Sequence, residues 1–67
     1  MKRLPEPGYT RLKDILTLFG VSRSSWYAAI EKGRIEPGTK LSARTVAWPN
    51  SYLNRLLDQL EEGKRIL

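Results

Sequence analysis

One short segment, residues 23–28, carries side chains that suit the recognition of nucleic acid. It combines a cation, two hydroxyls, a phenol and a small methyl group, at Arg23, Ser24, Ser25, Tyr27 and Ala28. An arginine or a serine can bind a base edge or a phosphate, and an alanine methyl can contact a thymine methyl. On a helix, the small side chains of Ser24 and Ala28 would let the backbone lie deep in a major groove. We therefore predict that this segment contacts double-stranded DNA, with the Tyr27 hydroxyl on the DNA backbone.

Two more cations, Lys40 and Arg44, flank a predicted β-hairpin. The segments 40–41 and 45–48 have the composition of short strands, with Val46 and Trp48 on one face by alternation. The turn between them, residues 42–44, lacks the glycine that favoured hairpin turns carry. Such a hairpin has the geometry of a wing whose tip meets an adjacent groove or a phosphate. We predict that Lys40 and Arg44 contact DNA, and Arg44 at the tip is the stronger candidate.

These residues also have a purely structural interpretation. Ser22 would be only a helix cap, Ser24 and Ser25 a polar first turn, and Tyr27 a half-buried core residue. Lys40 and Arg44 would be charges that keep an edge strand from pairing with another sheet. For the set as a whole we favour DNA contact. The two tryptophans could stack on bases, but in so small a domain we expect them in the core.

The composition argues against catalytic and metal chemistry. The 67 residues contain no His and no Cys, so the commonest general base and every thiolate site are missing. Glu61 and Glu62 are adjacent, and on a helix their side chains would diverge by about 100°. Two carboxylates in this arrangement cannot act together as a catalytic pair. The five glycines are scattered singly and form no phosphate-binding loop. We predict a protein that is not an enzyme and has no cofactor and no metal.

The net charge of +5 is unevenly distributed along the chain. Residues 1–48 hold nine basic and four acidic side chains, whereas residues 49–67 hold three of each. Lys32, Arg34, Arg11 and Lys13 belong to the basic part but receive no assigned role. The asymmetry indicates a polyanionic partner for the first two-thirds, and a solubilising surface is the alternative.

Apolar spacing predicts two short helices joined as a helix-turn-helix. The first would begin at the cap Thr10 and end at Gly20, with an apolar face of Leu12, Ile15, Leu16 and Phe19. The second, capped by Ser22, would run to Gly33 with Trp26, Ala29 and Ile30 on its inner side. About three residues, centred on Gly20 and Val21, connect the two helices, which is the tight turn of that arrangement.

A third helix, opened by Pro49 and ending at Gly63, has the clearest periodicity. Trp48 or Asn50 would cap it. Its apolar stripe is Tyr52, Leu53, Leu56, Leu57 and Leu60, and its polar face is Asn54, Arg55, Asp58, Gln59, Glu61 and Glu62. We expect the stripe to pack on the first two helices, with a dimer seam as the alternative. In a different class of function, the stripe would dock a partner protein and the chain would not bind DNA.

The sequence therefore predicts a mainly α fold with a small β-hairpin, a winged helix-turn-helix of three helices plus a wing. We expect a flexible N-terminal arm over residues 1–8, the DNA-binding domain over 9–63 and a C-terminal tail over 64–67. The chain begins with Met1 and has no long apolar run, so we expect an intact cytoplasmic protein without membrane contact.

The stretches GVSRSSWYAAIEKGRI and KLSARTVAWPNSYLNRLLDQLEEG resemble the AlpA-like phage and prophage regulatory proteins. That family has a Ser-Arg-Ser/Thr-Thr start to the recognition helix, an aromatic two residues on, a Gly after the helix, a basic wing ending in Arg, and a Trp opening the last helix. These features fall on Ser22, Arg23, Ser24, Ser25, Tyr27, Gly33, Arg44 and Trp48. The family usually has Gly in the wing turn and acidic residues opening the last helix, where this chain has Ser42, Ala43, Asn50 and Ser51.

The resemblance implies a MerR-type winged helix-turn-helix, similar to phage excisionases, in a sequence-specific DNA-binding protein of a mobile element. It would be a transcriptional regulator or, alternatively, an excisionase that binds and bends DNA for an integrase. So small a module buries roughly 600–1,000 Å² on DNA, so we expect a homodimer or several copies on adjacent sites.

Overall fold

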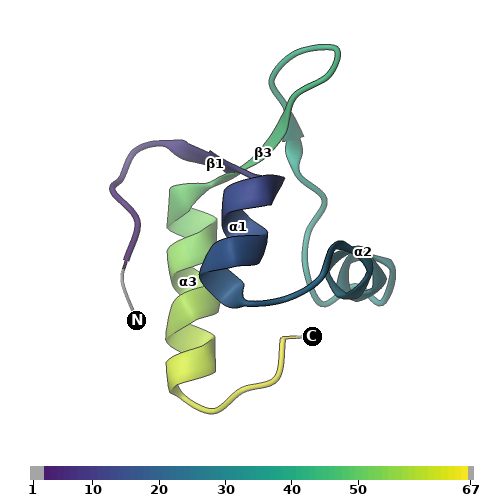
Figure 1. Cartoon of the computed structure of the whole chain (residues 1–67). Coiled ribbons are helices and arrows are strands. Elements are labelled where there is room, and N and C mark those ends of the chain that lie inside the picture. Colours follow the sequence, from purple (N-terminus) through teal and green to yellow (C-terminus); the bar gives the residue numbers. More distant parts are fainter. Residues whose placement is uncertain (1–2, 67) are drawn as a thin grey trace.

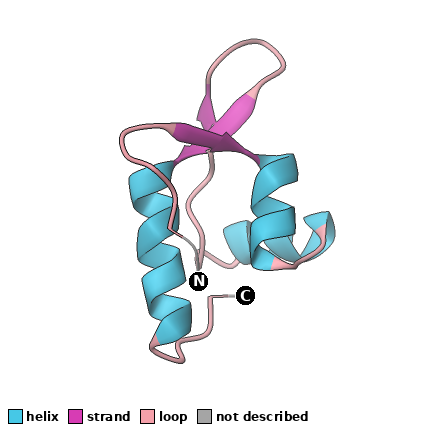
Figure 2. Cartoon of the chain, turned by 60° about the vertical axis from the view of Figure 1, so that its left-hand side comes forward, coloured by secondary structure: helices cyan, strands magenta, loops and turns pink. Residues whose placement is uncertain are grey.

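The computed structural model describes residues 3–66, whose arrangement is shown in Figure 1. The elements in chain order are β1 (Tyr9–Arg11), α1 (Leu12–Phe19), α2 (Arg23–Glu31), β2 (Thr39–Lys40), β3 (Val46–Pro49) and α3 (Asn50–Glu61). The strands form one antiparallel sheet in the order β1-β3-β2. Helices α1 and α3 extend from one side of this sheet, and the β2–β3 hairpin projects from the other (Figure 2). The predicted winged helix-turn-helix, with three helices and a wing, is confirmed.

The first helix begins one residue later than predicted. Thr10 does not cap α1, because it lies in β1, where it pairs with Trp48. The N-cap is Arg11, which makes no side-chain cap hydrogen bond. The end of the helix is as predicted, since Gly20 adopts the left-handed conformation at φ 68° and donates its N–H to Leu16 at 2.9 Å.

Ser22 caps α2, as the sequence predicts. Its Oγ accepts the backbone N–H of Ser25 at 3.2 Å, and the helix begins at the next residue, Arg23. Only residues 20–22 separate α1 from α2, which confirms the helix-turn-helix connection. The third helix begins at Asn50 with Pro49 in the N-cap position, so neither Trp48 nor Asn50 is its cap.

The wing, which we define as residues 39–49, closes without a glycine in its turn. Its register pairs Thr39 with Ala47 and Lys40 with Val46. The loop is closed by Leu41, whose N–H donates to the carbonyl of Thr45 at 2.8 Å. Among residues 3–66 no residue other than glycine has a positive φ. The loop therefore needs none of the left-handed positions that two-residue hairpin turns require.

Trp26 and Trp48 form the centre of the core. Both are buried, and their rings make an edge-to-face contact with centroids 5.5 Å apart. Phe19 makes a similar contact with Trp26 at 5.6 Å. Other buried apolar side chains come from all three helices, the segments between them and the tail: Leu12, Ile15, Ala29, Ile35, Leu53, Leu56 and Ile66. The core interpretation of the tryptophans is confirmed, and the predicted tail places Ile66 in the core.

Gly38 lets the wing approach Trp48 closely. A Cβ atom on Gly38 would lie 2.6 Å from Cγ1 of Val46 and 2.9 Å from Cε2 of Trp48. Val46 and Trp48 therefore share the face that covers Gly38, as strand alternation predicts. The side chain of Val46 is 39 % exposed and can move, whereas Trp48 is buried and cannot.

The Gly38→Ala variant should lower the free energy of unfolding by about 1–3 kcal/mol, because the added methyl overpacks the site. Urea denaturation of the variant and the parent measures this difference. In a Val46→Ala background one of the two clashes disappears, so the penalty should shrink but persist. A penalty near zero in both backgrounds would show that Trp48 is not held against Gly38.

No helix of residues 3–66 has the length and apolar character needed to cross a membrane.

Candidate nucleic-acid interface

The predicted contact residues lie on two elements, α2 and the wing. Four of these residues are exposed on α2: Arg23, Ser24, Ser25 and Tyr27. The next residue, Ala28, is half-buried. Lys40 and Arg44 are exposed on the wing, in β2 and in the loop. The helix and the hairpin are thus positioned by the same core, since α2 is anchored by Trp26 and the wing by Trp48.

A groove between these elements brings three of the predicted residues together. Arg23 and Tyr27 from α2 and Arg44 from the wing line a cavity of about 270 Å³. We call this cavity the basic groove, and its full lining is Arg11, Leu12, Lys13, Arg23, Tyr27, Arg44, Thr45 and Val46. Ser24, Ser25, Ala28 and Lys40 lie outside its lining.

Arg11 and Lys13, which received no role from the sequence, also line the basic groove. Both lie where β1 passes into α1. Strand β1 pairs with β3, which holds Arg11 opposite Ala47 near the base of the wing. The signal that could have identified the two residues was their membership of the basic part of the chain. Their position could not be inferred without the pairing of β1.

The groove gathers positively charged side chains that no acidic side chain of its lining neutralises. Its lining contains four cationic side chains and no acidic one. None of Arg11, Lys13, Arg23 and Arg44 makes an ion pair with a residue of the described part of the chain. Like charges held on one concave surface repel one another, so a bound anion relieves that repulsion. An anion would therefore be stabilised in the groove.

Exposed apolar side chains occur on the same two elements, α2 and the wing. Four large hydrophobic residues are exposed within residues 3–66, and three of them belong to α2 or the wing: Tyr27, Leu41 and Val46. Tyr27 and Val46 line the basic groove beside its cations. A nucleic-acid strand presents both phosphates and apolar sugar and base surfaces, so it suits a mixed surface of this kind.

The N-terminal turn of α2 is partly occupied by its own cap. The Ser22 hydroxyl donates to Oγ of Ser25 at 3.0 Å and accepts its backbone N–H. This matches the structural interpretation of Ser22, and it leaves Ser24 as the serine of this turn with no side-chain bond within the described residues. DNA contact by Ser24, Ser25, Ala28 and Lys40 stays a prediction.

A family model described as the prophage CP4-57 regulatory protein (AlpA) matches residues 8–59. The chain belongs to the AlpA family. The match runs from the start of β1 into α3 and so includes the whole helix-turn-helix and the wing. No curated protein and no solved structure matches the chain significantly. The AlpA family is a family of phage-related regulators, not of enzymes, and the resemblance found in the sequence is confirmed.

The remaining surface of this AlpA-family chain has a different character. Residues 3–8, here called the N-terminal segment, lie against α3, and α2 is on the other side of the domain (Figure 1). A second hollow, lined by Glu6, Pro7, Gly8, Tyr9, Pro49 and Ser51, carries one carboxylate and no cation.

Among residues 3–66 no three His, Cys, Asp or Glu side chains form a group that could hold a metal.

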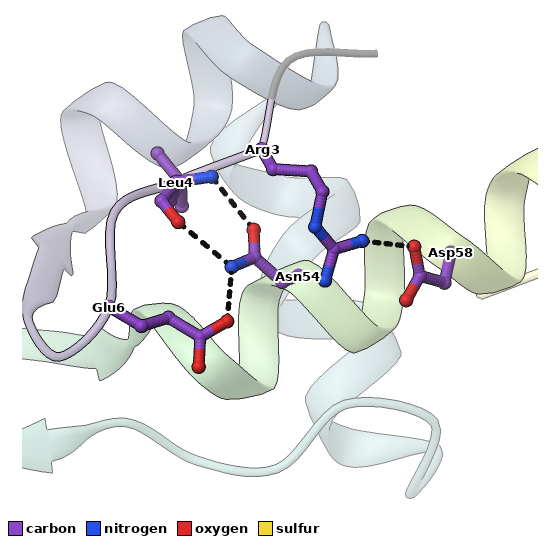
Figure 3. A network of polar contacts seen from close by, with 5 residues as sticks. All are labelled: Arg3, Leu4, Glu6, Asn54 and Asp58. Carbon is purple, nitrogen blue, oxygen red and sulfur yellow. Dashed lines mark hydrogen bonds and ion pairs between the residues drawn. The ribbon is translucent and has the colours of Figure 1, made fainter.

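Two asparagines of α3 bind the N-terminal segment of the AlpA-family chain. Asn54 accepts the N–H of Leu4 at 2.8 Å and donates to the carbonyl of Leu4 at 2.9 Å and to the Glu6 carboxylate at 2.7 Å (Figure 3). Asn50 donates to the carbonyl of Pro5 at 2.7 Å. Asn54 belongs to the predicted polar face of α3, but the N-terminal segment covers it, so it is only 2 % exposed.

The N-terminal segment has no helix or strand, but its contacts are more extensive than a flexible arm implies. Arg3 forms an ion pair with Asp58, and the carbonyl of Gly8 accepts the N–H of Asn50 at 2.8 Å. The mobility of the arm stays a prediction. Met1 and Lys2, its first two residues, lie outside the described residues.

Proposed function

We propose that this AlpA-family chain binds double-stranded DNA sequence-specifically with α2 and the wing and thereby regulates transcription in a phage or other mobile element. The observation that carries the proposal is the basic groove. Four cations from β1, α1, α2 and the wing, together with the exposed apolar side chains of Tyr27 and Val46, face one concave surface. An anionic strand with apolar sugars complements that surface in charge and in polarity.

In this proposal α2 enters a major groove and the wing lies over the neighbouring backbone. Arg23, at the N-terminal end of α2, binds a guanine edge, and Ser24, Ser25 and Ala28 contact adjacent base edges. Tyr27 and Arg44 bind the strand that runs through the basic groove. Arg11 and Lys13 extend the same row of phosphate contacts on one side and Lys40 on the other.

The alternative within DNA binding is an excision factor that assists an integrase, since it would need the same contacts. The protein-interaction adaptor is disfavoured by the packing of α3. Leu53, Leu56 and Leu57, the centre of its apolar stripe, are buried in the core of this chain, so they could not dock a partner without unfolding the domain. Because the proposed partner is DNA, we also propose a cytoplasmic location and binding as a dimer or as several copies on adjacent sites.

Selection from a random duplex library tests the proposal. The full chain is mixed with duplexes that carry a randomised 20-bp centre, bound DNA is recovered over several rounds, and the pool is sequenced. We expect one enriched site, and we expect the Arg23→Ala, Arg44→Ala double variant to enrich none. No enrichment by the parent protein would overturn the proposal. A reporter of transcription and an assay of excision, both using the enriched site, then separate the regulator from the excision factor.

A further inference from the structure

Leu41, at the base of the wing loop, has an apolar side chain that does not belong to the hydrophobic core. It is 50 % exposed, although burial of a leucine stabilises a small domain. It follows Lys40 directly, and Arg44 lies in the same loop. The loop that starts at Leu41 is the part of the molecule that projects furthest from the helices (Figure 1).

The backbone around Leu41 is held in place. Its N–H donates to the carbonyl of Thr45 at 2.8 Å, and the N–H of Ser42 reaches the same carbonyl at 3.3 Å. The strand that follows leads into buried Trp48, whose Nε1 donates to the carbonyl of Glu36 at 2.8 Å. A leucine on a fixed, narrow hairpin can be pressed into a partner at little cost in conformational entropy.

We propose that Leu41 is a wedge that enters the minor groove of the bound DNA, partly unstacks one base step and bends the duplex. The proposal rests on the proposed function. Proteins that bend DNA often insert an apolar side chain between base steps, and they hold the kinked backbone with cations on either side. The wing has this layout, because Lys40 and Arg44 flank Leu41 and neither makes an ion pair with a described residue.

The proposal gives the wing a part in sequence selection. Unstacking is easiest at pyrimidine–purine steps such as TA and CA. Leu41 would therefore favour sites with such a step at a fixed distance from the bases that α2 contacts. That preference arises from the deformability of the step and needs no hydrogen bond to a base.

The test compares the parent protein with Leu41→Ala and Leu41→Met on the duplex that the parent enriches. Dyes at the two ends of a 30-bp duplex report the bend by energy transfer, and 2-aminopurine placed along the site reports unstacking by a rise in fluorescence. With the parent and with Leu41→Met, we expect a bend and one bright position. With Leu41→Ala both signals should vanish, and affinity should fall roughly three- to tenfold because the contacts that the bend permits are lost.

Tyr9→Ala is the matched control, since Tyr9 is also an exposed apolar residue but lines the second hollow and not the basic groove. It should retain the bend. Leu41→Ala should keep the salt dependence of binding, because it removes no cation. A bend that is equal for Leu41→Ala and the parent would overturn the wedge while leaving DNA binding intact. Failure of the parent to enrich any duplex would remove the proposed function and the wedge with it.

Sedimentation of the free proteins tests the alternative that Leu41 packs against a second copy of the chain and not against DNA. We expect Leu41→Ala and the parent to sediment identically without DNA. A dimer of the parent that Leu41→Ala dissociates would show that Leu41 packs against another protein chain and would overturn the wedge.

Discussion

The Arg23→Ala variant should bind the preferred duplex roughly five- to a hundredfold more weakly and should discriminate less at one base pair. Loss of a bidentate contact to a base edge costs about 1–3 kcal/mol and relaxes specificity at the contacted position. Arg44→Ala, by contrast, should weaken binding by a similar factor on every duplex, because Arg44 lies on the wing and binds phosphate. Fluorescence anisotropy with the preferred duplex and with variants changed at single positions measures both effects.

Arg55→Ala is the control that distinguishes the effect of the groove cations on DNA affinity from the effect of the total charge of the protein. It removes one positive charge from α3, where the guanidinium of Arg55 lies 5.7 Å from the centre of the Tyr52 ring, and not from the groove. We expect a loss of less than about threefold, as for a screened distant charge. If Arg55→Ala weakened binding as much as Arg23→Ala, the groove would not be the binding surface. A uniform loss for Arg23→Ala would make Arg23 a phosphate contact.

The Asn54→Ala variant should lower the free energy of unfolding by about 2–4 kcal/mol, because three hydrogen bonds of a buried amide group are lost together. One amide group binds both backbone groups of Leu4 and the carboxylate of Glu6. For a domain of this size the melting temperature should fall by roughly 4–8 °C per kcal/mol. Thermal denaturation followed by circular dichroism measures the shift.

Arg3→Ala is the matched comparison, since Arg3 joins the same segment to the same helix. Its ion pair with Asp58 is about half exposed on both sides, and such pairs contribute no more than about 1 kcal/mol. In Asn54→Ala, but not in Arg3→Ala, the amide proton of Leu4 should also exchange rapidly with solvent. Equal stability of the two variants would show that the N-terminal segment is not fastened by Asn54.

The helices could be predicted because local signals determine them. Gly20 and Ser22 set the turn between α1 and α2 through a left-handed φ and a hydroxyl cap, and both effects act within a few residues. Strand β1 could not be predicted in this way. Residues 9–11 are extended because β3 supplies their hydrogen-bond partners from almost 40 residues away. The same pairing explains why Thr10, a good cap by type, does not cap α1.

The candidate site could be predicted in part. Residue type and charge identified Arg23, Tyr27 and Arg44, and the structure brings these three together. Arg11 and Lys13 were missed because only the β1–β3 pairing places them beside the wing. The burial of Asn54 could not be predicted for a related reason. Periodicity assigns an asparagine to the polar face of a helix, and it cannot show that a chain segment 50 residues away will cover that face.

The dependence of DNA affinity on salt tests the central claim most directly. If Arg11, Lys13, Arg44 and Lys40 bind phosphates, the logarithm of the association constant should fall with the logarithm of salt concentration at a slope of about −4. The Arg44→Ala variant should reduce the magnitude of that slope by about one. A slope near zero for the parent protein, or a slope unchanged in Arg44→Ala, would contradict the assignment of this face to DNA.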